Sequence, residues 1–423
     1  MKMKLWITAI AAIVIFASCA PTQAGEVVQS EKQRITSPNV NQADQAALVD
    51  GNNAFALDTY QVIRKAEGNL FFSPYSISLA LAMTYAGARG TTAQQMANTL
   101  HFTLPQEQLH PAFNSLDTEL SQRGQGAKGK DEKGFRLNIV NAIWGQKGYK
   151  FLPEFLDTLA QNYGAGLRTL DFKQASEASR ITINDWVSQQ TEGRIKDLIP
   201  KGAIDPLTRL VLTNAIYFNA AWQFPFKKES TKDGAFHLLD GREVTVPMMR
   251  QTEWLGYAEG ANYQAVELPY DGRQLSMVIL LPRTGQFAEF EKSLDANQLK
   301  AITRDISSER IALTMPRYEF TSEFSLAKTL TDMGMPDAFT GRADFSGMTG
   351  RPDLLISDVF HKAFVAVDEE GTEAAAATAV IMALKAAPGA PIEVTVDRPF
   401  IFLIRDIKTG TLLFIGRVLN PST

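Results

Sequence analysis

Cysteine is almost absent from this chain. The only one among the 423 residues is Cys19, close to the N-terminus. A chain with one cysteine cannot form an internal disulfide, and the rest of it has no thiol for nucleophilic, redox or metal chemistry. Its stability must therefore come from a large hydrophobic core, and about 380 folded residues are enough to build one.

Histidine is scarce, and no catalytic motif surrounds the few that occur. The four histidines are scattered along the chain: His101, His110, His237 and His361. The sequence also has no Gly-x-Ser-x-Gly elbow, no Gly-x-Gly-x-x-Gly after a predicted strand, and no phosphate loop in the glycine-rich residues 121–134. We therefore expect no metal site, no cofactor and no enzyme active site.

An excess of charge of one sign is also missing. Lysine and arginine number 42 against 46 acidic residues, which gives a net charge of −4. A nucleic-acid partner is therefore not expected. The apolar run at residues 5–17 is too short to span a bilayer comfortably, so we expect contact with a membrane only through a lipid anchor.

What the N-terminus does contain is an export signal, expected at residues 1–18. Its end, Phe16-Ala17-Ser18-Cys19, resembles a bacterial lipobox, which would make Cys19 the lipidated first residue of a cell-envelope lipoprotein. Two acyl chains would anchor such a protein firmly. The alternative is an ordinary signal peptide that ends at Ala20 or Ala24 and releases a secreted protein. Both interpretations predict an exported chain.

The remainder divides into a short linker and one domain. Residues 19–43 are rich in Gln, Ser, Asn and Pro and have no apolar period, which predicts a flexible tether. In the domain, residues 44–423, helical patterns come early and strand patterns late, which favours an α+β fold. Residues 137–144 and 210–218 are apolar on both faces, as in buried strands, and residues 400–405 and 411–418 suit a hairpin.

The most unusual segment is residues 369–378. It combines a glycine with four alanines, which favour helix, inside surroundings that look extended. Small side chains recur at alternate positions, so one face of this segment could slide into a closed sheet without steric conflict. These positions are Thr372, Ala374, Ala376 and Thr378.

This segment resembles the mobile hinge of the serpin family, and five well-separated motifs from about residue 45 to 421 agree with that resemblance. They are Asn69-x-x-x-Ser73-Pro74-x-Ser76, Thr213-Asn214 to Trp222, His361-Lys362 to Asp368-Glu369, Asp397-Arg398-Pro399-Phe400, and Gly416-Arg417-Val418-x-Asn420-Pro421. The resemblance implies a serpin fold: a large mixed main sheet, further sheets, about nine helices, and an exposed reactive loop at about residues 371–397.

The resemblance also implies roles for individual residues. A buried hydrogen-bonded gate beneath the main sheet would consist of Ser73, Ser76, Asn214 and His361. The loop would enter the sheet at Trp222, with Glu369 paired to Arg317. The hinge would comprise Glu369, Glu370, Gly371, Thr372, Glu373, Ala374, Ala375, Ala376, Ala377 and Thr378. Without the resemblance, His361 is an ordinary core histidine, Trp222 a core aromatic and the ion pair a weak surface contact.

Family spacing places the scissile bond after the fifteenth residue of the loop, counted from Gly371 as the first. That bond joins Lys385 to Ala386. Lysine there suits a protease whose specificity pocket carries a carboxylate, as in trypsin-like enzymes. Loop spacing varies by a residue or two, so cleavage after Leu384 or Met382 is the alternative. It would indicate a protease that prefers leucine or methionine.

Three hypotheses for function follow from these patterns. The first is a monomeric suicide inhibitor of serine proteases, trapped as a covalent acyl complex, with papain-like cysteine proteases as secondary targets. The second is a non-inhibitory carrier or chaperone with the same fold. The third is a hydrolase, which would need a nucleophile and base that the sequence does not present.

Overall fold

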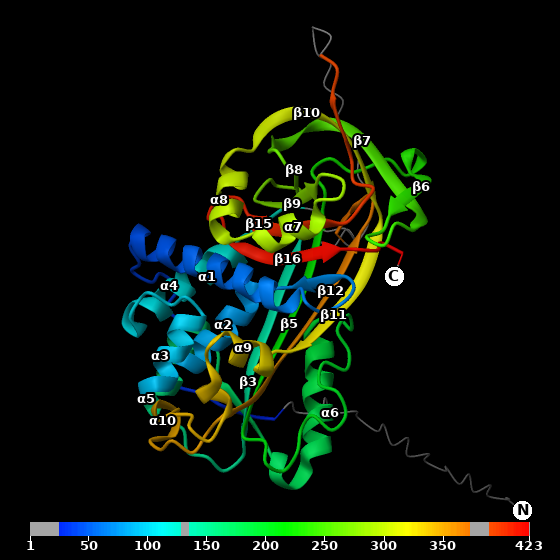
Figure 1. Cartoon of the computed structure of the whole chain (residues 1–423). Helices are drawn as coiled ribbons and strands as arrows, with labels where there is room; N and C mark the ends of the chain where they lie inside the picture. The colour runs from blue at the N-terminus through cyan, green and yellow to red at the C-terminus, as the bar shows by residue number, and fades with distance from the viewer. Residues whose placement is uncertain (1–24, 128–134, 373–388, 423) are drawn as a thin grey trace, which may run out of the picture.

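The computed structural model describes residues 25–127, 135–372 and 389–422 (Figure 1). It contains a seven-stranded main sheet and a nine-stranded second sheet, with ten α-helices among the described residues. This confirms the predicted α+β class, with a large mixed main sheet. Within the described residues no helix has the length and apolar character needed to cross a bilayer.

The strands have the following bounds. The main sheet runs, in spatial order, β1 (Glu26–Val28), β4 (Leu167–Leu170), β3 (Arg136–Gln146), β5 (Leu210–Ala221), β13 (Gly371–Thr372), β12 (Ile356–Val367) and β11 (Tyr318–Ser325). The second sheet runs β14 (Ile392–Thr395), β10 (Ser307–Pro316), β7 (Glu243–Glu259), β8 (Tyr263–Pro269), β9 (Leu275–Pro282), β15 (Phe400–Asp406), β16 (Leu412–Val418) and β2 (Leu70–Phe72), and β6 (Lys232–His237) pairs with β7. The predicted strand at 210–218 is β5, which is buried throughout. The one at 137–144 is β3, whose first residues are only half-buried, and the predicted hairpin is β15 with β16.

The helices gather mainly in the first half of the chain. They are α1 (Gln42–Ile63), α2 (Pro74–Tyr85), α3 (Gly90–Thr99), α4 (Gln106–Ser121), α5 (Pro153–Tyr163), α6 (Phe172–Gln190), α7 (Phe287–Ser293), α8 (Ala296–Arg304), α9 (Ala327–Met333) and α10 (Ser346–Thr349). Two short 3-10 turns, η1 (Lys228–Ser230) and η2 (Pro336–Phe339), complete the described elements.

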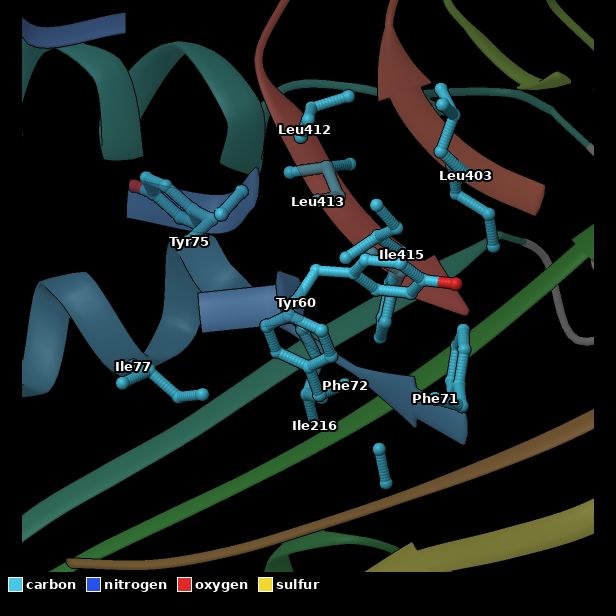
Figure 2. Close-up of a cluster of buried hydrophobic side chains, with 14 of the residues drawn as sticks. Tyr60, Phe71, Phe72, Tyr75, Ile77, Ile216, Leu403, Leu412, Leu413 and Ile415 are labelled. Atoms are coloured by element: carbon cyan, nitrogen blue, oxygen red, sulfur yellow. The ribbon is translucent and has the colours of Figure 1, made fainter. Parts of the chain in front are cut away.

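The central strand β5 is buried on both faces because a different core covers each one. Val211 and Ala215 belong to a smaller core with Ile183 and Val187 of α6. The alternate residues, including Ile216, face the larger core, where Figure 2 shows side chains of α1, β2, α2, β5 and the β15–β16 hairpin packed together. An all-apolar strand is the expected sequence for a position between two such layers.

Helix α2 lies between the sheets and is buried along its whole length. It begins sharply, because the Ser73 side chain caps the backbone N–H of Ser76 and Pro74 supplies a fixed backbone angle at the first helical position. Its start lies under the middle of the main sheet, next to β3 and β5. This placement brings Ser73 and Ser76 to the sheet's inner face.

The predicted tether is wrong for residues 26–35. Strand β1 pairs antiparallel with β4 at the edge of the main sheet. Farther along, Arg34 Nε donates to Asn114 Oδ1 at 2.7 Å and its Nη2 lies 2.6 Å from Asp117 Oδ2, both on α4. These attachments use backbone and charged groups, which leave no apolar period in the sequence.

Replacing Arg34 with alanine is expected to lower the free energy of unfolding by about 1 kcal/mol, because a hydrogen bond and a partly exposed ion pair are lost. Urea unfolding of a chain that retains residues 25–423 would measure this. Lys32→Ala is the matched control, since the Lys32 side chain is more exposed and pairs with Asp157 at the surface. Equal effects of the two substitutions would contradict an anchoring role for Arg34.

Candidate functional site

The main sheet is divided where β5 meets β12, a junction that we call the seam. Over one part the two strands pair directly in parallel, from Leu210 opposite Ile356 to Ile216 opposite Ala363. Their direct pairing ends there. At the far end the two residues of β13 lie between them, antiparallel to both. The seam is thus closed along one half and held apart at the other.

The four predicted gate residues meet at the closed half of the seam. His361 of β12 is hydrogen-bonded through Nδ1 to Asn214 Oδ1 of β5, directly across the seam. Asn214 Nδ2 donates to Ser76 Oγ at 2.6 Å, and the Ser73 backbone N–H donates to His361 Nε2 at 3.2 Å. All four residues are fully buried. Opening the seam must therefore break a buried hydrogen bond.

A fifth residue, Asn141 of β3, belongs to the same cluster. Its Oδ1 accepts from Ser76 Oγ at 3.0 Å and from Asn214 Nδ2 at 2.5 Å, and its Nδ2 donates to the Ser76 carbonyl. The sequence analysis missed this residue. Its signal was available: Asn141 is the one polar residue in the apolar run 139–145 of β3, and such a residue must find partners when buried.

The hydrogen bonds determine the protonation state of His361. Because Nε2 accepts from the Ser73 N–H, the ring proton is on Nδ1, which donates to Asn214. Burial lowers the pKa of His361 to about 3, so the ring is neutral near neutral pH. A protonated ring would present a second N–H to the Ser73 donor, and the cluster has no acceptor at that point.

The free energy of unfolding should therefore fall as the pH is lowered from 6.5 towards 3. In this window the unfolded chain protonates His361, whose ordinary pKa is 6.5, while the folded protein does not. The loss amounts to about 1.4 kcal/mol per pH unit for one such group. His361→Gln should reduce the slope by that amount, as measured by urea unfolding across this range. Part of the slope should remain in His361→Gln, because burial also lowers the pKa of His110, to about 4.

His237→Gln, which makes the same replacement at an exposed histidine, is the matched control for the substitution itself. If His361→Gln and the wild-type protein have the same slope, the neutral buried state of His361 is contradicted.

Trp222 contacts the chain at residues 368–370, where that segment reaches the open end of the seam. Its ring stacks on Tyr270, with centroids 4.7 Å apart and planes 9° apart. Its Nε1 donates to the Asp368 carbonyl at 2.9 Å, and its backbone N–H donates to the Glu370 carbonyl at 2.9 Å. Trp222 is thus a buried aromatic, as expected without the resemblance, and also contacts the segment that leads into the hinge.

Glu369 and Arg317 are neighbours, as the resemblance implies. The carboxylate is buried, whereas the Arg317 side chain is 49% exposed, and Nε lies 3.6 Å from Glu369 Oε2. The shorter bond to Glu369 comes from Thr231 Oγ1, at 2.6 Å. The ion pair is therefore looser than a direct hydrogen bond, and Thr231 is a partner that the sequence did not reveal.

The first residues of the predicted hinge are already within the main sheet. Gly371 lies so close to β5 that a Cβ atom there would be 2.2 Å from the Ala220 carbonyl oxygen, so no other residue fits without a shift. Thr372 is buried, and its Oγ1 lies 2.8 Å from the Tyr270 hydroxyl. Tyr270 was missed in the sequence, because nothing in its local pattern marks it as a hinge contact.

Other predicted site residues lie outside the part of the chain that the structure describes. These are Glu373, Ala374, Ala375, Ala376, Ala377 and Thr378 of the hinge, Lys385 and Ala386 of the scissile bond, and the lipidation residue Cys19. Among the described residues, no group of three or more His, Cys, Asp or Glu side chains is arranged to hold a metal ion.

Comparison with known proteins agrees with this geometry. The family model described as "Serpin (serine protease inhibitor)" matches residues 50–421. The rat leukocyte elastase inhibitor A is 42% identical over 387 residues, which cover 88% of this chain and 99% of that protein.

Two solved structures show the same fold. The crystal structure of tengpin, a thermophilic serpin in its native state, has a TM-score of 0.81 and 28% identity, and the match covers 93% of this chain and 97% of tengpin. Human thyroxine-binding globulin, crystallised in complex with thyroxine, has a TM-score of 0.79 and 31% identity, covering 89% of this chain and 99% of that one.

Proposed function

This chain belongs to the serpin family, and on that premise we propose that it inhibits serine proteases as a suicide substrate. The observation that carries the proposal is the position of Gly371 and Thr372. They already lie between β5 and β12, at the open end of a seam that could admit the rest of the hinge. Under this proposal the protein is an inhibitor and not an enzyme.

The reaction begins as ordinary proteolysis. The protease's serine oxygen attacks the carbonyl carbon of Lys385, and its proton passes through the protease's histidine to the nitrogen of Ala386. The Lys385–Ala386 bond breaks, leaving an ester between Lys385 and the protease and a free amine on Ala386. Water would normally hydrolyse this ester. Insertion of the released hinge before that step would trap the complex, because it drags and distorts the attached protease.

The observed register predicts where the inserted strand would end. Gly371 faces Ala221 and Thr372 faces Ala220, and the same antiparallel register would bring Met382 opposite Leu210, the first residue of β5. The new strand would match all 12 residues of β5. It would gain on the order of 10–15 ladder hydrogen bonds, each worth about 1 kcal/mol net. That exceeds the cost of separating one buried polar cluster.

Insertion would also separate His361 from Asn214, because the new strand occupies the space between β5 and β12. The same register would place Thr378 opposite Asn214, so a small hydroxyl side chain would replace the imidazole as its neighbour. A fully bonded cluster that breaks only when a strand enters is suited to a two-state gate. The gate would hold the seam closed until the loop is cut.

The preferred target is a trypsin-like protease, because Lys385 would fill a pocket that carries a carboxylate. Cleavage after Leu384 or Met382 is the alternative and suits a protease that prefers an apolar residue. The likeness to a relative named as an inhibitor of leukocyte elastase supports testing that alternative. Papain-like cysteine proteases are proposed as secondary targets.

We further propose that the protein acts as an exported monomer. With Cys19 lipidated it would be held at the cell envelope, and with an ordinary signal peptide it would be secreted. The described fold begins soon after this point, since β1 starts at Glu26. A lipid anchor would therefore hold the domain close to the membrane surface.

The test is to mix the mature domain with trypsin and analyse the products by denaturing gel electrophoresis and mass spectrometry. We expect a denaturant-resistant band at the summed mass and a released peptide that begins at Ala386. Cleavage at Ala386 without such a band would make the protein a substrate of trypsin. If chymotrypsin-like and elastase-like proteases also fail to form the band, the inhibitory proposal is wrong.

A second candidate is a non-inhibitory binding protein, favoured by the likeness to thyroxine-binding globulin. The small residues of the hinge argue against it, since a carrier does not need to insert them. A stable covalent complex with any protease would exclude this candidate.

A further inference from the structure

We infer that Lys228 is a positioning residue for loop insertion, because it holds the turn at residues 368–371 in the conformation that the inserted hinge needs. The inference rests on the proposed function, since it concerns the step that would trap the protease. Lys228 is the first residue of the short 3-10 turn η1, and no motif in the sequence marked it.

The turn at residues 368–371 already reverses the chain between β12 and β13. Val367, the last residue of β12, pairs antiparallel with Thr372 of β13. The Asp368 backbone N–H donates to the Gly371 carbonyl at 3.1 Å and closes the turn. Residues added to β13 during insertion would continue the same pairing along β12, so the turn itself would not change. The reversal that insertion requires is therefore present in the uncut protein.

Backbone groups of the residues that follow β5 hold this turn from one side. The Trp222 N–H donates to the Glu370 carbonyl at 2.9 Å, and the Phe226 N–H donates to the Glu369 carbonyl at 2.8 Å. Within the turn, the Glu370 N–H donates to Asp368 Oδ1 at 3.0 Å. These bonds fix the backbone of the turn, and its charged side chains need partners of their own.

Three consecutive carboxylates make this turn electrostatically unfavourable unless cations lie near it. They belong to Asp368, Glu369 and Glu370, and like charges on adjacent residues of a tight turn repel one another. Glu369 accepts the hydrogen bond from Thr231 and lies beside Arg317. That leaves the charge of Glu370 to be balanced.

Lys228 supplies the cation for Glu370. Its Nζ lies 2.5 Å from Glu370 Oε1, and the Glu370 side chain is only 12% exposed whereas that of Lys228 is 69% exposed. The carboxylate is thus largely shielded from water, which would otherwise stabilise its charge. The hydrogen bond to Glu370 raises the pKa of Lys228, and the charges of Asp368 and Glu369 raise it further. Lys228 therefore interacts favourably with all three acids of the turn.

Loss of Lys228 should affect insertion and not the cleavage that precedes it. A turn that is already formed spares the hinge the entropic cost of bringing the two strands together. Without Lys228, repulsion among the acids would favour an open turn, and insertion would compete less well with hydrolysis of the ester. The quantity to measure is the partition ratio, which is the amount of cleaved inhibitor divided by the amount of covalent complex.

The experiment compares Lys228→Ala with Lys232→Ala, which removes an exposed lysine at the start of β6. Each variant retains residues 25–423 and is mixed with the protease that the wild-type protein traps fastest, and the partition ratio is read from denaturing gels. We expect Lys228→Ala to raise the ratio about threefold, the size of effect typical of an exposed ion pair, with no change in the rate constant of loop cleavage. Lys228→Arg should restore the wild-type ratio, and Lys228→Glu should raise it further.

Salt distinguishes a positioning role from a purely structural one. Raising NaCl from about 0.05 M to about 0.5 M screens exposed charges, so the ratio of the wild-type protein should approach that of Lys228→Ala, whose own ratio should not rise. If Lys228→Ala and Lys232→Ala give the same ratio, the inference is wrong, even where a covalent complex forms.

The two proposals fail in different ways. If no protease forms a covalent complex, the inhibitory function is wrong, and insertion of the cut loop is then followed by tryptophan fluorescence, since Trp222 contacts the turn. A fluorescence change about threefold slower in Lys228→Ala than in Lys232→Ala would keep the inference. Equal rates, or no change after the loop is cut, would overturn it.

Discussion

Replacing Thr372 with arginine is expected to turn the protein from an inhibitor into a substrate of its target protease. The number of inhibitor molecules consumed per protease molecule should rise from about one to more than about ten. Cleaved, monomeric protein should replace the covalent complex on a denaturing gel. The protease would regain its activity once the inhibitor is consumed.

The reason lies in the position of Thr372. Its side chain is 2% exposed and touches the Tyr270 hydroxyl, with Trp222 stacked behind that ring. An arginine would be expelled from this buried place in the uncut protein, and it would carry an unpaired charge back into the core when the hinge inserts. Such a charge costs about 3–5 kcal/mol, which would slow insertion on the order of 10²–10⁴-fold. Hydrolysis of the ester would then be faster than trapping.

The adjacent residue provides a matched control. By alternation the side chain of Glu373 would point away from the core when the hinge inserts, so Glu373→Arg introduces the same side chain without burying it. This variant should stay inhibitory. If Thr372→Arg also keeps a stoichiometry near one, insertion past Tyr270 is not the trapping step.

The second large effect is expected at the proposed scissile bond. Lys385→Glu should lower the rate of complex formation with trypsin on the order of 10³-fold, because a carboxylate replaces the ammonium group that would enter a carboxylate-bearing pocket. Two like charges in a desolvated pocket cost several kcal/mol, and each 1.4 kcal/mol is a factor of ten in rate. Residual trypsin activity, measured at successive times after mixing, would give the rate of complex formation for each variant.

Two further variants make this result specific. Lys385→Arg keeps the positive charge and should retain rapid inhibition of trypsin. Lys385→Leu should transfer inhibition to a chymotrypsin-like protease. If Lys385→Glu leaves the rates unchanged and the released peptide begins after Leu384 or Met382, the scissile bond is one of the two alternatives, and the target prefers an apolar residue.

Much of the fold was predictable because its signals are local. The apolar run of β5 indicates a strand covered on both faces, and the β15–β16 hairpin follows from two strand patterns joined by a turn. The composition of the hinge and the scattered motifs identified the family. Ser73, Ser76, Asn214 and His361 came from those motifs and not from any pattern of their own.

Other parts depend on contacts between distant residues, which a local pattern does not record. Strand β1 has only three residues, and it forms a strand only because the edge of β4 is available to pair with it. Asn141 joins the polar cluster because the β3–β5 register brings it opposite Asn214. Tyr270 meets Thr372 across about a hundred residues of chain.

The sequence by itself thus determined the family, the buried strands and a hinge of small residues, because side-chain size and periodicity are properties of neighbouring positions. Only the tertiary structure decided that Gly371 and Thr372 already lie in the sheet and that His361 bonds to Asn214 across the seam. Each of these depends on strand register and on the packing of two sheets, and both are set by the whole chain at once.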